Sequence, residues 1–411
     1  MLRMSPKFKS ALLFLDQGVF SGSSFLITIL LARLLFVEDF GVYAGVVLVL
    51  YLLVSLINAF VSQPMQVRLS HENDKHTYLS FTFWFQLASS IVVVAIVFLL
   101  FMAPIDLLAQ YSTLTLPIVL FSLGFILHDY FRKRFLAEDR IPETLLIDIL
   151  LMAGHFFAIG YSFYTSTSSL SQIILLLGFG YVPAFLTGAF LSNPSFKNAQ
   201  QWLGFLKVHI NEGKWLFYSA LIQWWAGNLF VVASGFFLGP VALGALRLVQ
   251  SVFGLLNVLF QTFENYVLPQ TAIRLHQSSD DARAFLRKVG AKSLLGVSTL
   301  LLILFLFSDF FIVMAGGEQF REYGFLIKGM SILYALIFVG YPIRIAIRVL
   351  VLNKIFFKGY VLTFVFGLLS SYLLLSLFHL AGAIAGLITS QLILIIYWQY
   401  QLQKKEFILW K

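Results

Sequence analysis

Charged side chains within long apolar segments are the residues of this sequence that could do chemistry. Arg33 and Arg247 each lie close to one end of such a segment, and Lys328 lies near the start of another. A guanidinium stays charged when it is buried and can bind a phosphate through two parallel hydrogen bonds. These cations are therefore candidate ligands of an anion. Their alternative roles are contacts with lipid head groups or ion pairs with nearby acids such as Glu38.

Three acidic residues occupy similar positions. Asp16 lies in the first long apolar segment, Asp148 near the start of a later one, and Glu264 toward the end of another. A carboxylate in apolar surroundings can bind Na⁺ or a proton, or it can neutralise an arginine. Each could equally be a partner in helix packing or a carboxylate at a membrane surface. We expect these acids to bind a coupling ion or to balance the candidate cations.

One apolar segment carries a run of polar and aromatic side chains, which could stack on sugars and hydrogen-bond to them. These candidate sugar contacts are Gln223, Trp224, Trp225 and Asn228.

Signatures of catalysis and of metal binding are missing from the sequence. It has no cysteine, no P-loop pattern and no His-Glu-x-x-His motif. His128 and His155 fit neutral side chains hydrogen-bonded between helices better than a proton relay. We therefore predict no catalytic residues and no metal site.

The composition identifies the class of protein in which these residues must act. Of the 411 residues, 60% are hydrophobic and 11% are charged, and the mean hydropathy is +0.89. A soluble domain carries about 25% charged residues, so this chain cannot cover a soluble surface. Because a helix needs about 20 apolar residues to cross a bilayer, the sequence predicts an all-α polytopic membrane protein.

Apolar segments of spanning length recur along the chain and predict twelve transmembrane helices. We expect them at 11–35, 40–62, 79–103, 114–133, 143–163, 170–191, 214–237, 243–268, 292–313, 323–349, 356–379 and 381–402.

Lys and Arg residues alternate regularly with these helices. If the N-terminus is cytoplasmic, all but four of the 28 Lys and Arg residues lie at cytoplasmic ends, the exceptions being Arg33, Arg247, Arg321 and Lys328. Cytoplasmic loops carry an excess of Lys and Arg. The pattern predicts that both termini are cytoplasmic, and it explains the net charge of +9 without a nucleic-acid partner.

Weak internal similarity predicts two pseudo-symmetric halves of six helices each. Gly41 matches Gly244, and Arg132 matches Arg344. An even number of helices in each half makes the two repeats parallel, related by an axis along the membrane normal. The predicted parts are an N-terminal half at 1–194, a cytoplasmic interfacial connector at 195–213 and a C-terminal half at 214–411.

Several local motifs of the sequence are informative together, namely Asp16–Phe25, Leu31–Leu35, Glu38–Tyr43, Arg132–Arg140, Gly317–Phe320 and Tyr341–Arg344. They resemble those of the bacterial polysaccharide biosynthesis membrane proteins, the Wzx-type O-antigen flippases of the MOP (MATE-like) exporter superfamily.

The resemblance implies a MATE-like fold and a flippase in the bacterial inner membrane. Its substrate would be an undecaprenyl-pyrophosphate-linked oligosaccharide, the repeat unit of an O-antigen, capsule or exopolysaccharide, moved across the bilayer by alternating access. A coupling Na⁺ or H⁺ could drive the transport, and no other cofactor is implied. A polysaccharide polymerase and other assembly proteins are the implied partners.

The resemblance also suggests roles for the candidate cations. Arg33, Arg247 and Lys328 would bind the pyrophosphate in a central cavity, while Arg132 and Arg344 would attract the anionic head group at the cytoplasmic mouth. For the last two residues the alternative is ordinary anchoring of cytoplasmic helix ends.

Two other functions are compatible with the helix pattern. A MATE-type drug/cation antiporter would have the same architecture. The basic residues predicted to line the cavity of this chain argue instead for an anionic cargo. A polysaccharide polymerase or ligase would be expected to hold catalytic residues in a sizeable periplasmic loop. The longest outer connection here, from Pro104 to Thr113, is short and contains no Arg or His. We therefore predict a transporter and not an enzyme.

Overall fold

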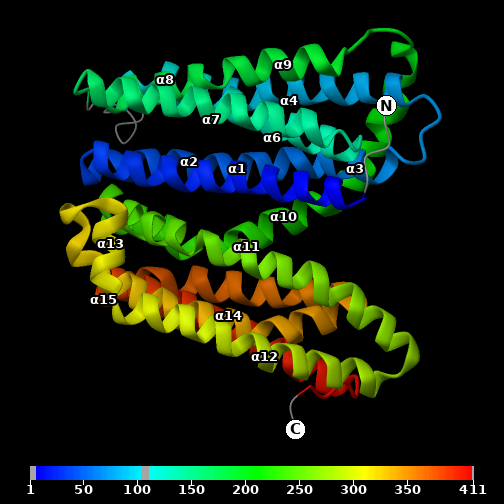
Figure 1. The fold of residues 1–411 in the computed structure, drawn as a ribbon, viewed down its shortest axis with the longest axis vertical. Helices are drawn as coiled ribbons and strands as arrows, with labels where there is room; N and C mark the ends of the chain where they lie inside the picture. Colours follow the sequence, from blue (N-terminus) through cyan, green and yellow to red (C-terminus); the bar gives the residue numbers. More distant parts are fainter. Residues whose placement is uncertain (1–5, 103–110, 168, 410–411) are drawn as a thin grey trace. The chain divides into compact units, whose positions relative to one another are not determined.

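The computed structural model describes residues 6–102, 111–167 and 169–409, which are almost entirely helical (Figure 1). The helices are α1 (Pro6–Leu34), α2 (Val37–Phe60), α3 (Ser62–Arg68), α4 (Lys75–Met102), α6 (Thr115–Ala137), α7 (Ile141–Tyr164), α8 (Leu170–Gly180), α9 (Val182–Ser192), α10 (Trp202–Leu238), α11 (Pro240–Gln277), α12 (Ser279–Leu306), α13 (Ser308–Gly316), α14 (Gly324–Val349) and α15 (Asn353–Lys404), with short 3₁₀ helices η1 (Ser112–Leu114), η2 (Ala199–Gln201) and η3 (Glu318–Tyr323).

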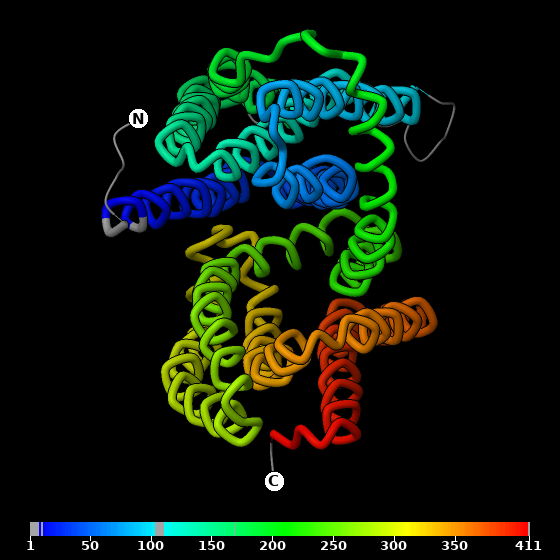
Figure 2. Tube along the Cα trace, turned by 90° about the vertical axis from the view of Figure 1, so that its right-hand side faces the viewer, coloured from blue at the N-terminus to red at the C-terminus, as the bar shows by residue number. Residues whose placement is uncertain are grey.

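Eleven helices in the described ranges are long and apolar enough to cross a bilayer. This number counts α15 once, although its backbone breaks at His379, where φ is 51° and ψ is −132°. The two arms of α15 coincide with the predicted helices 356–379 and 381–402 (Figure 2). A side chain at Gly382 would collide with the carbonyl group of Leu374, so this glycine lets the arms meet closely. The prediction of an all-α polytopic membrane protein is confirmed.

Three predicted helices differ most clearly from the observed ones. The helix expected at 292–313 begins earlier, at Ser279, and is divided at Phe307 into α12 and α13. The helix expected at 170–191 is divided at Tyr181 into α8 and α9, and Pro183 stands in the first turn of α9, where its missing N–H is tolerated. The helix expected at 214–237 begins earlier, at Trp202, so most of the predicted connector 195–213 belongs to the same continuous helix, α10. Charged residues near Gly213 therefore do not mark a helix end.

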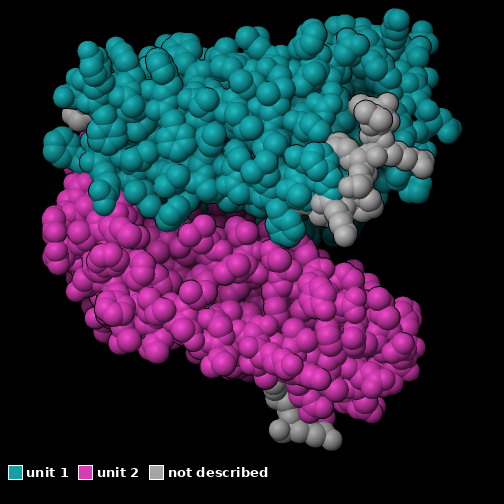
Figure 3. Space-filling view, viewed as in Figure 1, with its two compact units in different colours: residues 1–36, 46–221 teal, residues 37–45, 222–411 magenta. Residues whose placement is uncertain are grey.

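The chain forms two compact units, shown in separate colours in Figure 3. Unit 1 contains residues 1–36 and 46–221, and unit 2 contains residues 37–45 and 222–411. In unit 1, α1 packs against α7, and α6 packs against α4 and α8. In unit 2, α14 packs against α11, α12 and α15. These contacts bring together the charged residues that the sequence analysis considers one by one.

The N-terminal end of α2 packs in unit 2 through small residues. A Cβ atom at Gly244 would lie 2.8 Å from the Cα atom of Gly41, and one at Gly41 would meet the backbone of Pro240. The ring of Phe40 packs edge-on against that of Phe320, with 5.8 Å between the centroids. Two glycines that match in the predicted repeat thus lie against each other, and their lack of side chains permits the approach.

Asp74 precedes the first residue of α4 and accepts a hydrogen bond from the backbone N–H of Thr77 at 3.0 Å, as an N-cap residue does. Hydrogen bonds from the side chain and the backbone of Thr77 lower the pKa of the Asp74 carboxyl, because they favour its charged form. The capped start fixes α4 at its boundary with the preceding loop.

We expect Gly154→Ala to destabilise unit 1, because Gly154 of α7 faces the backbone of α8. A Cβ atom there would lie 2.5 Å from the carbonyl oxygen of Gly180, and overpacking of this kind costs about 1–3 kcal/mol. Thermal unfolding of the purified protein measures the effect. Gly160→Ala on the same helix is the control, since no atom lies within 4 Å of its added Cβ atom. Equal melting temperatures of the two variants would contradict the close approach.

Candidate functional site

An ion cluster in unit 1 joins three helices. The Arg132 guanidinium on α6 donates from Nη2 to Asp16 Oδ2 on α1 at 2.8 Å, and from Nε to Asp148 Oδ2 on α7 at 2.7 Å. Both aspartates are buried, and the Arg132 side chain is 13% exposed. The structure thus brings together two of the predicted ion-binding acids and a cation that the sequence analysis places at the cytoplasmic mouth.

Helical spacing sets up this cluster. His128 and Arg132 are four residues apart on α6 and therefore lie on the same helix face. Phe20 comes one turn after Asp16 on α1, and its ring lies 3.7 Å from the Arg132 guanidinium carbon. A cation held over a ring face gains further attraction from the π-electrons. Arg132 is therefore fixed by two carboxylates and an aromatic ring.

The unit 1 cluster carries one more negative than positive charge when His128 is neutral. The Oδ1 atoms of Asp16 and Asp148 are buried and have no hydrogen-bond partner among the described residues. His128 Nε2 lies 3.0 Å from Asp148 Oδ1, but the two atoms are not aligned for a hydrogen bond. Burying an unpaired carboxylate oxygen is costly, so uptake of a single cation would relieve the excess charge.

His155 of α7 lies near this cluster and is itself occupied. Its Nε2 atom is 3.2 Å from the carbonyl oxygen of Leu177 on α8, and its ring packs edge-on against that of Tyr181. This is the inter-helix hydrogen bond expected for His155, and it leaves the histidine in a packing role.

A second ion cluster lies in unit 2 and has the opposite charge balance. Glu264 on α11 contacts Arg348 on α14 directly, and its Oε2 atom lies 3.8 Å from Arg344 Nη2. Two guanidiniums thus share one carboxylate. Arg344 and Arg348 are four residues apart on one helix face, a spacing that could have indicated the pair. From the sequence, Glu264 is predicted as a charge-balancing acid and Arg344 as a cation of the cytoplasmic mouth, and their association through Arg348 is seen only in the structure.

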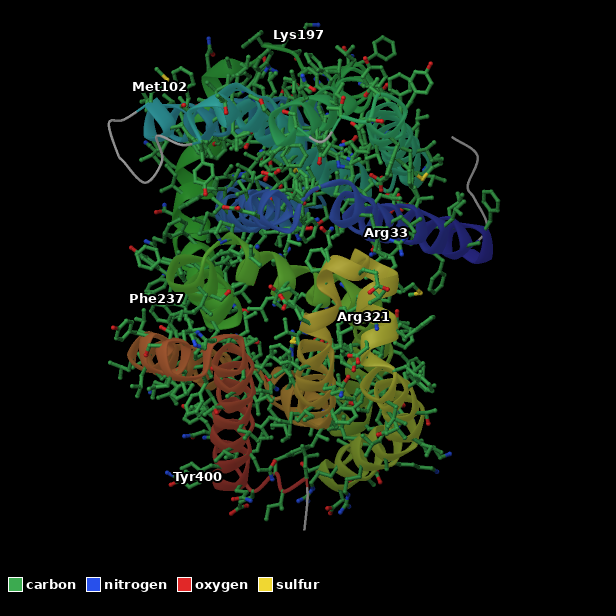
Figure 4. The ribbon with its side chains drawn as sticks, turned by 90° about the vertical axis from the view of Figure 1, so that its left-hand side faces the viewer. Arg33, Met102, Lys197, Phe237, Arg321 and Tyr400 are labelled. Carbon is green, nitrogen blue, oxygen red and sulfur yellow. The ribbon has the colours of Figure 1, made fainter. Side chains whose placement is uncertain are left out.

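The candidate pyrophosphate ligands lie on three helices. Arg33 is exposed in the last turn of α1 in unit 1 (Figure 4). In unit 2, Arg247 of α11 donates to Gln250 Oε1 at 2.9 Å, and Lys328 of α14 is exposed. A shared site for these three cations stays a prediction.

The candidate sugar contacts lie along α10 in unit 2. The Trp224 and Trp225 rings are 5.2 Å apart and nearly perpendicular. Asn228 donates to the carbonyl oxygen of Trp224 in its own helix, and Gln223 is exposed. Their binding of sugars stays a prediction.

No group of three or more His, Asp or Glu side chains in the described part of the chain is arranged to hold a metal ion.

A family model described as "Polysaccharide biosynthesis protein" matches residues 30–324, well over half of the chain. The chain belongs to this family. No curated protein sequence matches it significantly.

Solved structures share the fold of this family member at low sequence identity. The lipid II flippase MurJ in an inward closed conformation is 12% identical, with a TM-score of 0.68 over 97% of this chain and 89% of MurJ. An inward-facing multidrug resistance MATE family transporter of the MOP superfamily is 10% identical, with a TM-score of 0.64 over 99% and 97% of the two chains. An outward-facing structure described in the same words is 11% identical, with a TM-score of 0.63 over 98% and 96%.

The predicted MATE-like fold is therefore confirmed.

Proposed function

We propose that this family member is a flippase for an undecaprenyl-pyrophosphate-linked oligosaccharide in the bacterial inner membrane. The observation that carries the proposal is the family match over residues 30–324, which places the chain in polysaccharide biosynthesis. The fold shared with a lipid II flippase supports a lipid-linked cargo. The lipid-linked repeat unit of an O-antigen, capsule or exopolysaccharide is a cargo that agrees with both the family match and the shared fold.

The cargo explains why a carrier is needed. Sugars and a pyrophosphate lose their hydrogen bonds to water inside a bilayer, and each unsatisfied polar group costs several kcal/mol. A protein that offers cations and hydrogen-bonding groups replaces that water, while the lipid tail stays in the membrane. In this proposal Arg33, Arg247 and Lys328 bind the pyrophosphate, and the polar run on α10 meets the sugars.

Movement would follow alternating access, with both termini on the cytoplasmic side. The MATE relatives have been solved facing inward and facing outward, which supports two states for this fold. The unit 1 cluster of Asp16, Arg132 and Asp148 would take up a coupling H⁺ or Na⁺. Its one excess negative charge favours a single cation, and a proton on either unpaired Oδ1 atom would make the cluster neutral.

Deletion of the gene followed by analysis of membrane lipids tests the proposal. We expect undecaprenyl-linked sugar to accumulate at the inner leaflet and surface polysaccharide to disappear. The wild-type gene and Lys404→Ala, a change at the end of α15, should restore the polysaccharide, whereas Arg33→Ala and Arg247→Ala should not. An unchanged lipid pool with altered drug sensitivity would instead establish the MATE-type antiporter.

A further inference from the structure

The unit 2 cluster holds an arginine pair that is only partly neutralised. Arg344 and Arg348 project from one face of α14 toward α11, where both contact Glu264. The Arg344 Nη2 atom is 3.8 Å from Glu264 Oε2, which is beyond hydrogen-bond distance. The cluster therefore has one positive charge in excess.

Donors of this arginine pair remain unused. Arg344 Nε is buried and has no hydrogen-bond partner among the described residues. Each guanidinium offers five N–H donors. The two oxygens of a single carboxylate cannot satisfy the donors of both arginines. The Arg344 and Arg348 side chains are 35% and 46% exposed, so a ligand can reach them.

In the unit 1 cluster, by contrast, Arg132 has its hydrogen-bonding and charge requirements largely met. Arg132 uses Nε and Nη2 on two different carboxylates, lies against the Phe20 ring and is 13% exposed. It has little capacity for a further anion. Since Arg132 and Arg344 are matched positions of the predicted repeat, the two halves hold arginines with opposite surroundings, one over-neutralised and one under-neutralised.

We propose that Arg344 and Arg348 form a diphosphate-binding site and that Glu264 is its built-in counter-ion, displaced when the ligand binds. Glu264 keeps the two guanidiniums together while the site is empty. A diphosphate brings more charge and more acceptor oxygens than one carboxylate, and it can pair with both arginines at once. The proposal rests on the proposed function, because the diphosphate would be that of the carrier lipid. It would bind here at the cytoplasmic mouth, before it reaches the site proposed for Arg33, Arg247 and Lys328.

If Glu264 is displaced when the ligand binds, removal of its charge should strengthen the binding of pyrophosphate. Purified full-length protein in nanodiscs of zwitterionic lipid is titrated with inorganic pyrophosphate by calorimetry. We expect Glu264→Gln to bind at least about tenfold more tightly than the wild type, because the ligand no longer competes with a carboxylate. Arg344→Gln and Arg348→Gln should each weaken binding by a similar factor. Melting temperatures verify that the variants are folded.

Glu212→Gln is the matched control. Glu212 also lies 3.8 Å from an arginine, Arg68, but in unit 1 and outside the proposed site, so this change should leave pyrophosphate binding unaltered. Weaker binding by Glu264→Gln, or no binding by any variant, would overturn the proposal.

Competition identifies the source of the phosphate. Undecaprenyl pyrophosphate should displace bound pyrophosphate, whereas phosphatidylglycerol at the same concentration should not. Equal displacement by both would overturn the assignment to the carrier lipid. Failure of these binding tests while lipid-linked sugar still accumulates in the deletion strain would reject this site alone. Binding without such accumulation would reject the proposed function instead.

Discussion

Arg132→Met is expected to destabilise the protein severely and to abolish export. The substitution keeps an unbranched side chain but leaves the buried carboxylates of Asp16 and Asp148 without their shared cation. Removing one partner of a buried ion pair costs about 3–5 kcal/mol, because the remaining charge stays away from water without compensation. A large drop in melting temperature and loss of surface polysaccharide are the measurements.

Lys133→Met is the control for this prediction. Lys133 is the next residue on α6 and pairs with Asp129 at 2.8 Å, but about a third of each side chain is exposed. Such a pair contributes about 0.3–0.5 kcal/mol, so the change should scarcely alter melting. A triple variant that combines Arg132→Met with Asp16→Asn and Asp148→Asn should recover much of the lost stability, because no unpaired charge is left buried. If Arg132→Met melts like Lys133→Met, the cluster does not hold unit 1 together.

The sequence was sufficient to predict the class of fold, because every spanning helix must satisfy its own backbone and therefore leaves a long apolar run. The break of α15 at His379 coincides with the gap expected between 356–379 and 381–402. The length of α10 was not predictable in this way. Its polar positions suggested a helix end, but Gly213 lets α10 continue past α2, where a side chain would meet the backbone of Ala59 and Phe60.

The ion clusters show the limit of reading residues one at a time. Asp16 and Arg132 are 116 positions apart, so their hydrogen bond depends on how α1, α6 and α7 pack and not on local spacing. A charge that is expensive to bury can be identified from the sequence, but its partner cannot. The pairing of Glu264 with Arg348 has the same origin. Charge inside an apolar segment thus indicates where to look, and helix packing decides which charges balance.

Asp16→Asn is expected to make transport insensitive to pH. At a pH where both acids are charged, the unit 1 cluster has two carboxylates and one guanidinium, with His128 facing Asp148. Protonation of one of the two carboxylates makes the cluster neutral. Asparagine has the same shape as protonated aspartic acid and leaves the cluster permanently neutral, while its amide oxygen can still accept from Arg132. Proteoliposomes loaded with a fluorescent lipid-linked oligosaccharide should therefore flip it at one rate with or without an imposed pH gradient.

The reason for expecting this result is that a coupling site must exist in two charge states that favour different conformations. A gradient can drive the cycle only by shifting the protein between those states, and a residue that cannot titrate removes the shift. Asp129→Asn changes an acid on α6 that pairs with the partly exposed Lys133 and should preserve the response to the gradient. A wild-type rate that responds to a Na⁺ gradient but not to pH would identify Na⁺ as the coupling ion. An Asp16→Asn protein that still responds to the pH gradient would show that the proton binds elsewhere.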